Sequence, residues 1–103
     1  MLKFVVAVAF AVVPTTAQAN YPFVNGNMLH EMCSPAQSLC PFYVMGVVDG
    51  LTLVDRGSFC LPEGVNSGQV ADVVAKYLLD TPEKRHHTAA SLVALSLRLA
   101  FPC

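Results

Sequence analysis

Four cysteines are the residues of this sequence best suited to covalent chemistry: Cys33, Cys40, Cys60 and Cys103. An even number of cysteines in a short exported chain indicates disulfide bonds rather than free thiols. A bridged sulfur is not a thiolate, so it is neither a nucleophile nor a metal ligand. We therefore expect two disulfides and no cysteine-based active site.

The three histidines do not have the spacing of a metal site. His86 and His87 are adjacent, so within a helix their side chains would point to different sides, unlike a zinc-binding pair four residues apart. His30 is the only other histidine, and a zinc site that included the cysteines would need free thiols. We expect a solvated histidine pair and neither a metal nor another cofactor.

Asp49 is the one acid within a long apolar run, where it lies between Gly46 and Gly50. A buried acid has to be hydrogen-bonded or paired, so we expect it to bind the end of a neighbouring helix or Arg56. The alternative role is that of a general acid, but no second carboxylate or histidine lies at a fixed spacing from it. A Gly-x-Ser-x-Gly motif is absent as well. The sequence thus predicts no catalytic residue, and we expect a protein that is not an enzyme.

Residues 1–19 have the composition of a secretory signal peptide. A basic residue precedes the apolar run 4–13, and Ala17-Gln18-Ala19 has the small-x-small pattern of a cleavage site. The run has about half of the ~20 residues that span a bilayer core. The residue after the expected cut is Asn20 and not a cysteine, which disfavours a lipid anchor. We expect a cleaved signal peptide and one mature domain, residues 20–103, without membrane attachment.

The expected mature chain is slightly acidic. The whole sequence has six basic and seven acidic residues, and removal of residues 1–19 takes away one basic residue, Lys3, and no acid. It has no basic stripe, so nucleic acid is excluded as a partner. A domain of this size has a small hydrophobic core and usually needs covalent stabilisation. The two expected disulfides would provide it.

The periodicity of apolar residues predicts four helices. The first predicted helix starts after Asn25 or Asn27 and ends near Cys33, and the second runs from about Cys40 to Val54. The third starts after the cap Asn66, and the fourth starts at Thr81-Pro82-Glu83 and ends near Phe101. The second has an apolar stripe: Val44, Val47, Val48, Leu51 and Val54. The third has a glutamine three residues after its cap, the spacing of a capping box. Four helices with short connections predict an all-α, small, disulfide-bridged bundle.

The direction of these helices predicts the disulfide pairing. The second helix rises by about 1.5 Å per residue, which places Cys60 roughly 20 Å from Cys40, beyond the Cα separation of about 7 Å that a disulfide allows. The third helix would descend and the fourth would climb back, so Cys103 ends near Cys60. We expect Cys33 to pair with Cys40 and Cys60 with Cys103.

The segment from Asp55 to Val65 has the composition of a loop. Because it is polar and anchored by a cysteine, it could present a rigid contact surface at low entropic cost. The candidate partner-binding residues in it are Asp55, Arg56, Ser58, Phe59 and Glu63. On the second helix, Gly46 and Gly50 leave one face of bare backbone, which predicts close packing of another helix. This face, or another apolar helix face, could also form a homodimer.

Several linked motifs resemble one protein family over residues 25–103. The matching motifs are Tyr43-Val44-x-Gly46-Val47-Val48-Asp49-Gly50, Phe59-Cys60-Leu61-Pro62-x-Gly64-Val65, Gln69 with Val73-Val74-x-x-Tyr77-Leu78, Pro82-x-x-Arg85 with Ala89-Ala90-x-Leu92-Val93, and Ala100-Phe101-Pro102-Cys103. In this order they resemble the Rap1a/Tai family of immunity proteins. Linked motifs are more specific than one short pattern, although these are mainly caps, glycines, cysteines and core positions.

The resemblance implies an exported, disulfide-containing helical protein of the Gram-negative periplasm. It also implies a partner, a peptidoglycan amidase toxin delivered by type VI secretion, which the protein would bind and inhibit to protect the producing cell. One alternative is a periplasmic acid-stress or folding chaperone, for which only three histidines could titrate near neutral pH. Another is a family member with a different protein partner.

Overall fold

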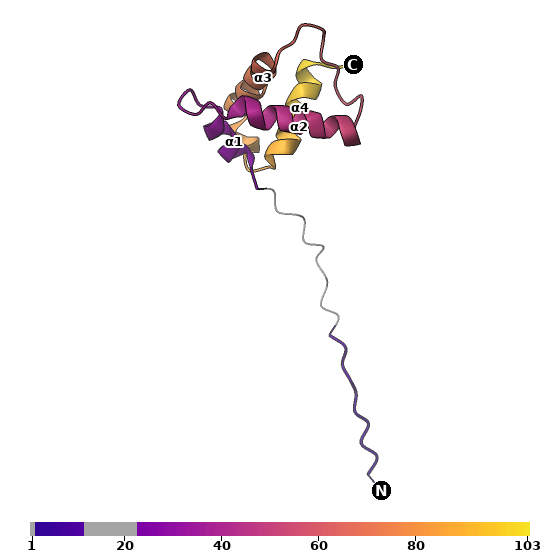
Figure 1. Ribbon diagram of the computed structural model, residues 1–103. Helices are drawn as coiled ribbons and strands as arrows, with labels where there is room; N and C mark the ends of the chain where they lie inside the picture. The colour runs from indigo at the N-terminus through magenta and orange to yellow at the C-terminus, as the bar shows by residue number, and fades with distance from the viewer. Residues whose placement is uncertain (1, 12–22) are drawn as a thin grey trace.

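The computed structural model describes residues 2–11 and 23–103, and within these ranges it contains four α-helices and no β-strand. The helices are α1 (Gly26–Met32), α2 (Cys40–Val54), α3 (Ser67–Asp80) and α4 (Ala89–Ala100), with a short 3-10 helix at Pro82–Lys84. They pack into one bundle in which α2 crosses in front of α4 (Figure 1). The predicted all-α, disulfide-bridged bundle is confirmed.

Side-chain caps determine where three of the helices begin. Asn25 Oδ1 accepts a hydrogen bond from the Met28 amide at 2.9 Å, and Asn66 Oδ1 accepts one from the Gln69 amide at 2.8 Å. Both are therefore N-caps, which satisfy backbone amides that have no partner within the helix. Thr88 has the same role for α4, because its hydroxyl accepts from the Ser91 amide. The predicted starts of the first and third helices are confirmed.

The predicted start of the fourth helix, at Thr81-Pro82-Glu83, is wrong. These residues form the 3-10 turn, and α4 begins only at Ala89. The backbone of residues 85–89 bonds instead to the chain entering α1: the Gly26 and Asn27 amides donate to the carbonyls of His87 and Arg85, and the Ala89 amide donates to the Val24 carbonyl. These long-range bonds replace the helical ladder that the local sequence predicts.

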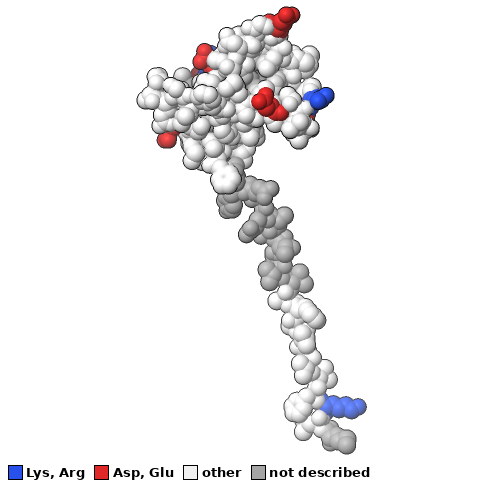
Figure 2. Space-filling view, viewed as in Figure 1, with Lys and Arg blue, Asp and Glu red and all other residues white. Residues whose placement is uncertain are grey.

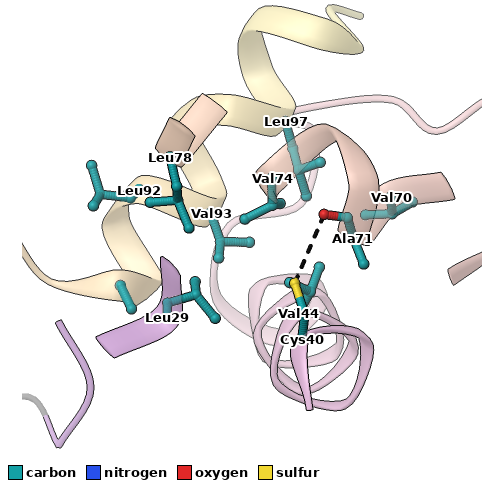
Figure 3. Close-up of a cluster of buried hydrophobic side chains, with 11 residues drawn as sticks. Leu29, Cys40, Val44, Val70, Ala71, Val74, Leu78, Leu92, Val93 and Leu97 are labelled. Carbon is teal, nitrogen blue, oxygen red and sulfur yellow. Dashed lines mark hydrogen bonds between the residues drawn. The ribbon is translucent and has the colours of Figure 1, made fainter. Parts of the chain in front are cut away.

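The core is formed by apolar side chains from all four helices, which point toward one another in Figure 3. Its fully buried members include Leu29 of α1, Val44 of α2, Val74 and Leu78 of α3, and Val93 and Leu97 of α4. Gly26 enables α1 to fit against α4 and the turn before it, because a Cβ there would meet the Leu92 side chain of α4 and lie 2.7 Å from the Arg85 carbonyl oxygen. The expected stripe on α2 is only partly correct, since Val54 is 81% exposed.

Two further expectations about α2 are wrong. A Cβ added at Gly46 or Gly50 would meet nothing within 4 Å, so no helix packs closely on this face among the described residues. Asp49 is exposed rather than buried. Arg56 does not bind its carboxylate, because the arginine Nε donates to the Thr52 carbonyl instead.

Residues 2–11 have no helix or strand, and their side chains are exposed. The expected cleavage motif Ala17-Gln18-Ala19 and the start of the expected mature chain lie outside the described residues. Within the part of the chain that the structure describes, no helix combines the length and the hydropathy needed to cross a membrane.

Candidate partner-binding loop

The loop from Asp55 to Glu63, here called the 55–63 loop, begins where α2 ends. The Asp55 amide donates to the Leu51 carbonyl at 2.8 Å and closes the last turn of the helix. Its carboxylate accepts a hydrogen bond from Arg98 Nη2 on α4 at 3.0 Å. Both side chains are about half exposed, so this ion pair orients the loop but adds little stability.

Arg56 and Gly57 turn the chain away from α2. The Nε of Arg56 donates to the Thr52 carbonyl at 2.9 Å, which satisfies a carbonyl at the negative end of the helix dipole. Gly57 has a φ of 90°, a conformation that favours glycine. The arginine is exposed, so its remaining guanidinium nitrogens are available to a partner.

Ser58 and Phe59 are the two half-buried residues of the loop before Cys60. Phe59 is half-buried and packs against the core, so it supports the loop more than it offers a contact. The hydroxyl of Ser58 is buried and has no hydrogen-bond partner. An open hollow of about 260 Å³ lies here, lined by Leu51, Thr52 and residues 55–59.

Cys60 fastens the loop to the segment that follows α4. Its amide donates to the Phe101 carbonyl at 2.9 Å, and its sulfur is bonded to that of Cys103, with the two Cα atoms 4.9 Å apart. The second disulfide joins Cys33 to Cys40. Both pairings are those that the helix directions predict. In Figure 1 the connection between α2 and α3 accordingly passes beside the end of α4.

Glu63 lies beyond Cys60, in a second turn. The Val65 amide donates to the Pro62 carbonyl, and Gly64 has a φ of 89°, the geometry of a type II turn with glycine in its third position. Glu63 does not line the hollow of the other four candidate residues. The structure therefore brings together Asp55, Arg56, Ser58 and Phe59 and places the glutamate apart from them.

The glycine face of α2 that the sequence indicated is part of a wider exposed face that is mostly apolar. Here called the α2 face, it consists of Phe42, Met45, Gly46, Asp49, Gly50 and Leu53. Phe42 is 69% exposed and Leu53 82% exposed. Charged side chains are sparse in the view of Figure 2, which has the orientation in which α2 crosses in front of α4. Apolar residues occur on several sides of α2, so the sequence alone does not show which side the bundle leaves exposed.

The other candidates for chemistry do not assemble a reactive site. His86 and His87 lie in the turn before α4 with ring centroids 4.2 Å apart, so the expectation that they point to different sides of a helix is wrong. Within the described ranges, no three histidine, cysteine or acidic residues are grouped for a metal. Burial raises the pKa of the Tyr43 hydroxyl above its ordinary value of 10.0, but this group lies outside the 55–63 loop.

A larger open hollow of about 580 Å³ lies between the end of α1 and the end of α3. It is lined by His30, Glu31, Cys33, Ser34, Pro35, Gln37, Ala75, Lys76 and Leu79. One of its charged lining residues, Lys76, is already paired with Asp80 at 2.9 Å. None of the candidate partner-binding residues predicted from the sequence contributes to it.

Comparison with protein families gives one family model, described as Rap1a immunity proteins, which matches residues 25–103. The match begins at the cap of α1 and includes all four helices and all four cysteines. Comparison with curated proteins and comparison with solved structures gave no match. Because the family model covers most of the sequence and the whole helical bundle, the chain belongs to the Rap1a immunity protein family.

Proposed function

We propose that this protein is a periplasmic immunity protein that binds and inhibits a peptidoglycan amidase effector of type VI secretion. The observation that carries the proposal is the family match over residues 25–103. An immunity protein acts by occupying its cognate effector, so the chain needs a rigid contact surface and no turnover of its own.

The proposed location is supported by the covalent chemistry. Two disulfides join all four cysteines, and structural disulfides persist in oxidising compartments such as the periplasm. We propose that residues 1–19 are a signal peptide that is removed on export. The apolar side chains within residues 2–11 are exposed, with Phe4 at 83% and Phe10 at 87%, so they contribute nothing to the core of the bundle.

The 55–63 loop is the proposed contact with the amidase. Residues 98–103 hold it through the Arg98 ion pair with Asp55, the bond from the Cys60 amide to the Phe101 carbonyl, and the Cys60–Cys103 disulfide. A loop that is already ordered loses little conformational entropy when it binds. Arg56 and Glu63 are its exposed charges without a charged partner in the structure, so they are the side chains best placed to select a partner.

An inhibition assay with purified type VI amidases tests the proposal. The oxidised protein should bind its cognate amidase and abolish peptidoglycan cleavage. Arg56→Ala and Glu63→Ala should each weaken inhibition by about tenfold, as loss of a charged contact in an interface typically does. Asp72→Ala, at an exposed acid of α3, is the matched control and should inhibit normally. Full inhibition by both loop variants would place the contact elsewhere, and absence of any amidase partner would contradict the proposed function.

We further propose that the α2 face forms a homodimer. An immunity protein exists free until its effector arrives, and an exposed apolar face of this kind favours a partner that is always present. Its apolar ends are arranged for self-pairing, because Phe42 and Leu53 are at its two ends, with Met45, two glycines and one charged residue, Asp49, between them. In an antiparallel pair about a two-fold axis, Phe42 would meet the partner subunit's Leu53. This leaves the 55–63 loop free for the amidase.

A further inference from the structure

The two disulfides lie in different surroundings. Cys40 is only 6% exposed and belongs to the core cluster, and Cys33 is half-buried. The Sγ of Cys40 lies 3.9 Å from the Ala71 carbonyl oxygen, along the dashed line of Figure 3. A bridged sulfur has no proton, so this is a contact and not a hydrogen bond. Cys60 and Cys103, in contrast, are both exposed.

We propose that the Cys60–Cys103 disulfide is a thiol-exchange site for dithiol oxidoreductases, while the Cys33–Cys40 disulfide stays closed. One thiolate of the dithiol attacks a sulfur of the exposed bridge, so that a mixed disulfide forms and the other sulfur leaves as a thiolate. The second thiol of the reductant then displaces the bound cysteine and becomes part of the reductant's own disulfide. The bridge takes up two electrons and two protons, and the dithiol loses the same number.

The leaving group explains why the exposed bridge reacts first. Attack on either Cys60 or Cys103 releases the other as a thiolate that water can solvate. Attack on Cys33 would release the Cys40 thiolate into the core, where that residue is only 6% exposed. A nearby carbonyl oxygen does not distinguish the two bridges, because Cys103 Sγ lies 3.5 Å from the Gly57 carbonyl oxygen. Burial disfavours the charged form and raises the pKa of a thiol, which makes it a poorer leaving group. Attack on Cys40 itself is hindered by the residues that bury it.

Opening this bridge would change the 55–63 loop more than the bundle. Three contacts remain between the loop and residues 98–103: the half-exposed ion pair of Arg98 with Asp55, the bond from the Cys60 amide to the Phe101 carbonyl, and the exposed Cys103 Sγ at 3.5 Å from the Gly57 carbonyl oxygen. None of them holds a loop firmly in water. In the folded state the helices keep their buried core, but the unfolded chain loses the constraint of a long closed loop, so the fold is also less stable. Thiol exchange would therefore loosen the contact surface, an effect on inhibition that rests on the proposed function.

The order of reduction tests the site directly. The oxidised protein is treated with limiting dithiothreitol, new thiols are trapped with N-ethylmaleimide, and labelled peptides are mapped by mass spectrometry. The first doubly labelled species should carry the label at Cys60 and Cys103, which should react about tenfold faster than the other pair. Earlier labelling of Cys33 and Cys40, or simultaneous labelling of all four, would overturn the proposal.

The coupling to inhibition needs a separate measurement on the half-reduced, labelled protein. Its affinity for the cognate amidase should fall by about tenfold or more relative to the oxidised protein, because the loop is no longer preorganised. The half-reduced Arg56→Ala variant is the control. Its affinity for the amidase should be only slightly lower than that of the half-reduced wild-type protein. Equal affinity of the oxidised and half-reduced forms would overturn the coupling. If the oxidised protein bound no amidase, the proposed function would fail, and the order of labelling alone would decide the exchange site.

Discussion

At the scale of single residues, alanine substitutions at Gly26 and at Gly46 should have opposite effects on stability. A Cβ at Gly26 would lie 2.7 Å from the Arg85 carbonyl oxygen, whereas one at Gly46 would meet nothing within 4 Å. Gly26→Ala should lower the free energy of unfolding by about 2–3 kcal/mol through overpacking. Gly46→Ala should raise it by about 0.5–1 kcal/mol, because alanine is the better helix former. Urea denaturation measures both, and equal effects would show that α1 does not pack on α4 as described.

Tyr43 gives the folded protein a pH dependence in the alkaline range. Desolvation by burial raises the pKa of its hydroxyl above 10.0 in the folded state. Between the ordinary pKa and this raised one, the unfolded chain loses the proton while the folded chain keeps it, so stability must fall as the pH rises. Tyr43→Phe should therefore lose less stability than the wild type as the pH rises above 10.0, the ordinary pKa of tyrosine. Identical pH profiles for the two in thermal denaturation would contradict the burial of this hydroxyl.

At the scale of elements, the α2 face predicts an antiparallel homodimer. Phe42→Lys and Leu53→Glu should each weaken the dimer, because each places a charge against an apolar side chain. The two substitutions together should restore part of the association, since an antiparallel pair brings the new lysine to the partner subunit's new glutamate. The two positions are eleven residues apart on one helix, roughly 16 Å, so they do not pair within one chain. Sedimentation equilibrium measures the dissociation constants.

The control for the dimer is Leu99→Lys, at a leucine of α4 that is 67% exposed. It should leave the association unchanged. A wild-type protein that stays monomeric at millimolar concentration would exclude the dimer. A double variant that dissociates more readily than either single variant would exclude the antiparallel arrangement.

The elements also show which structural features a sequence can predict. Asn25 and Asn66 act within one turn of their own helices, so their caps are visible in the local sequence. The start of α4 depends on bonds between residues 85–89 and residues 24–27, which no local pattern contains. The exposure of Gly46 and Asp49 likewise depends on which side of α2 the bundle covers, and apolar residues occur on several sides of this helix. Local signals therefore predicted the helices, but the surface of α2 required the tertiary packing.

For the 55–63 loop, too, the local sequence predicted some features, whereas others depend on tertiary contacts. Its composition and the cysteine at its centre identified it as an exposed, anchored segment, and four of its five named residues do lie around one hollow. The support that Arg98 gives to Asp55 comes from a residue 43 positions away. Phe59, named as a contact residue, is partly used by the core. A sequence pattern marks where a loop lies, but not which of its side chains are already engaged.

At the scale of the whole molecule, the two disulfides should contribute unequally to stability. The Cys60–Cys103 bridge joins residues 43 positions apart and the Cys33–Cys40 bridge joins residues 7 apart. In the chain-entropy model, a longer closed loop restricts the unfolded chain more, which gives about 4 kcal/mol for the long loop and about 2.5 kcal/mol for the short one.

The double substitutions Cys60→Ala/Cys103→Ala and Cys33→Ala/Cys40→Ala measure this difference by urea denaturation. Alanine leaves no polar group in the core at position 40, but it removes the buried sulfur, which adds a packing penalty of about 1 kcal/mol to the short-loop variant alone. The long-loop variant should nevertheless be the less stable of the two. If the short-loop variant were clearly less stable, the Cys33–Cys40 bridge would act mainly by packing α1 against the core, and the exposed bridge would serve the loop rather than the fold.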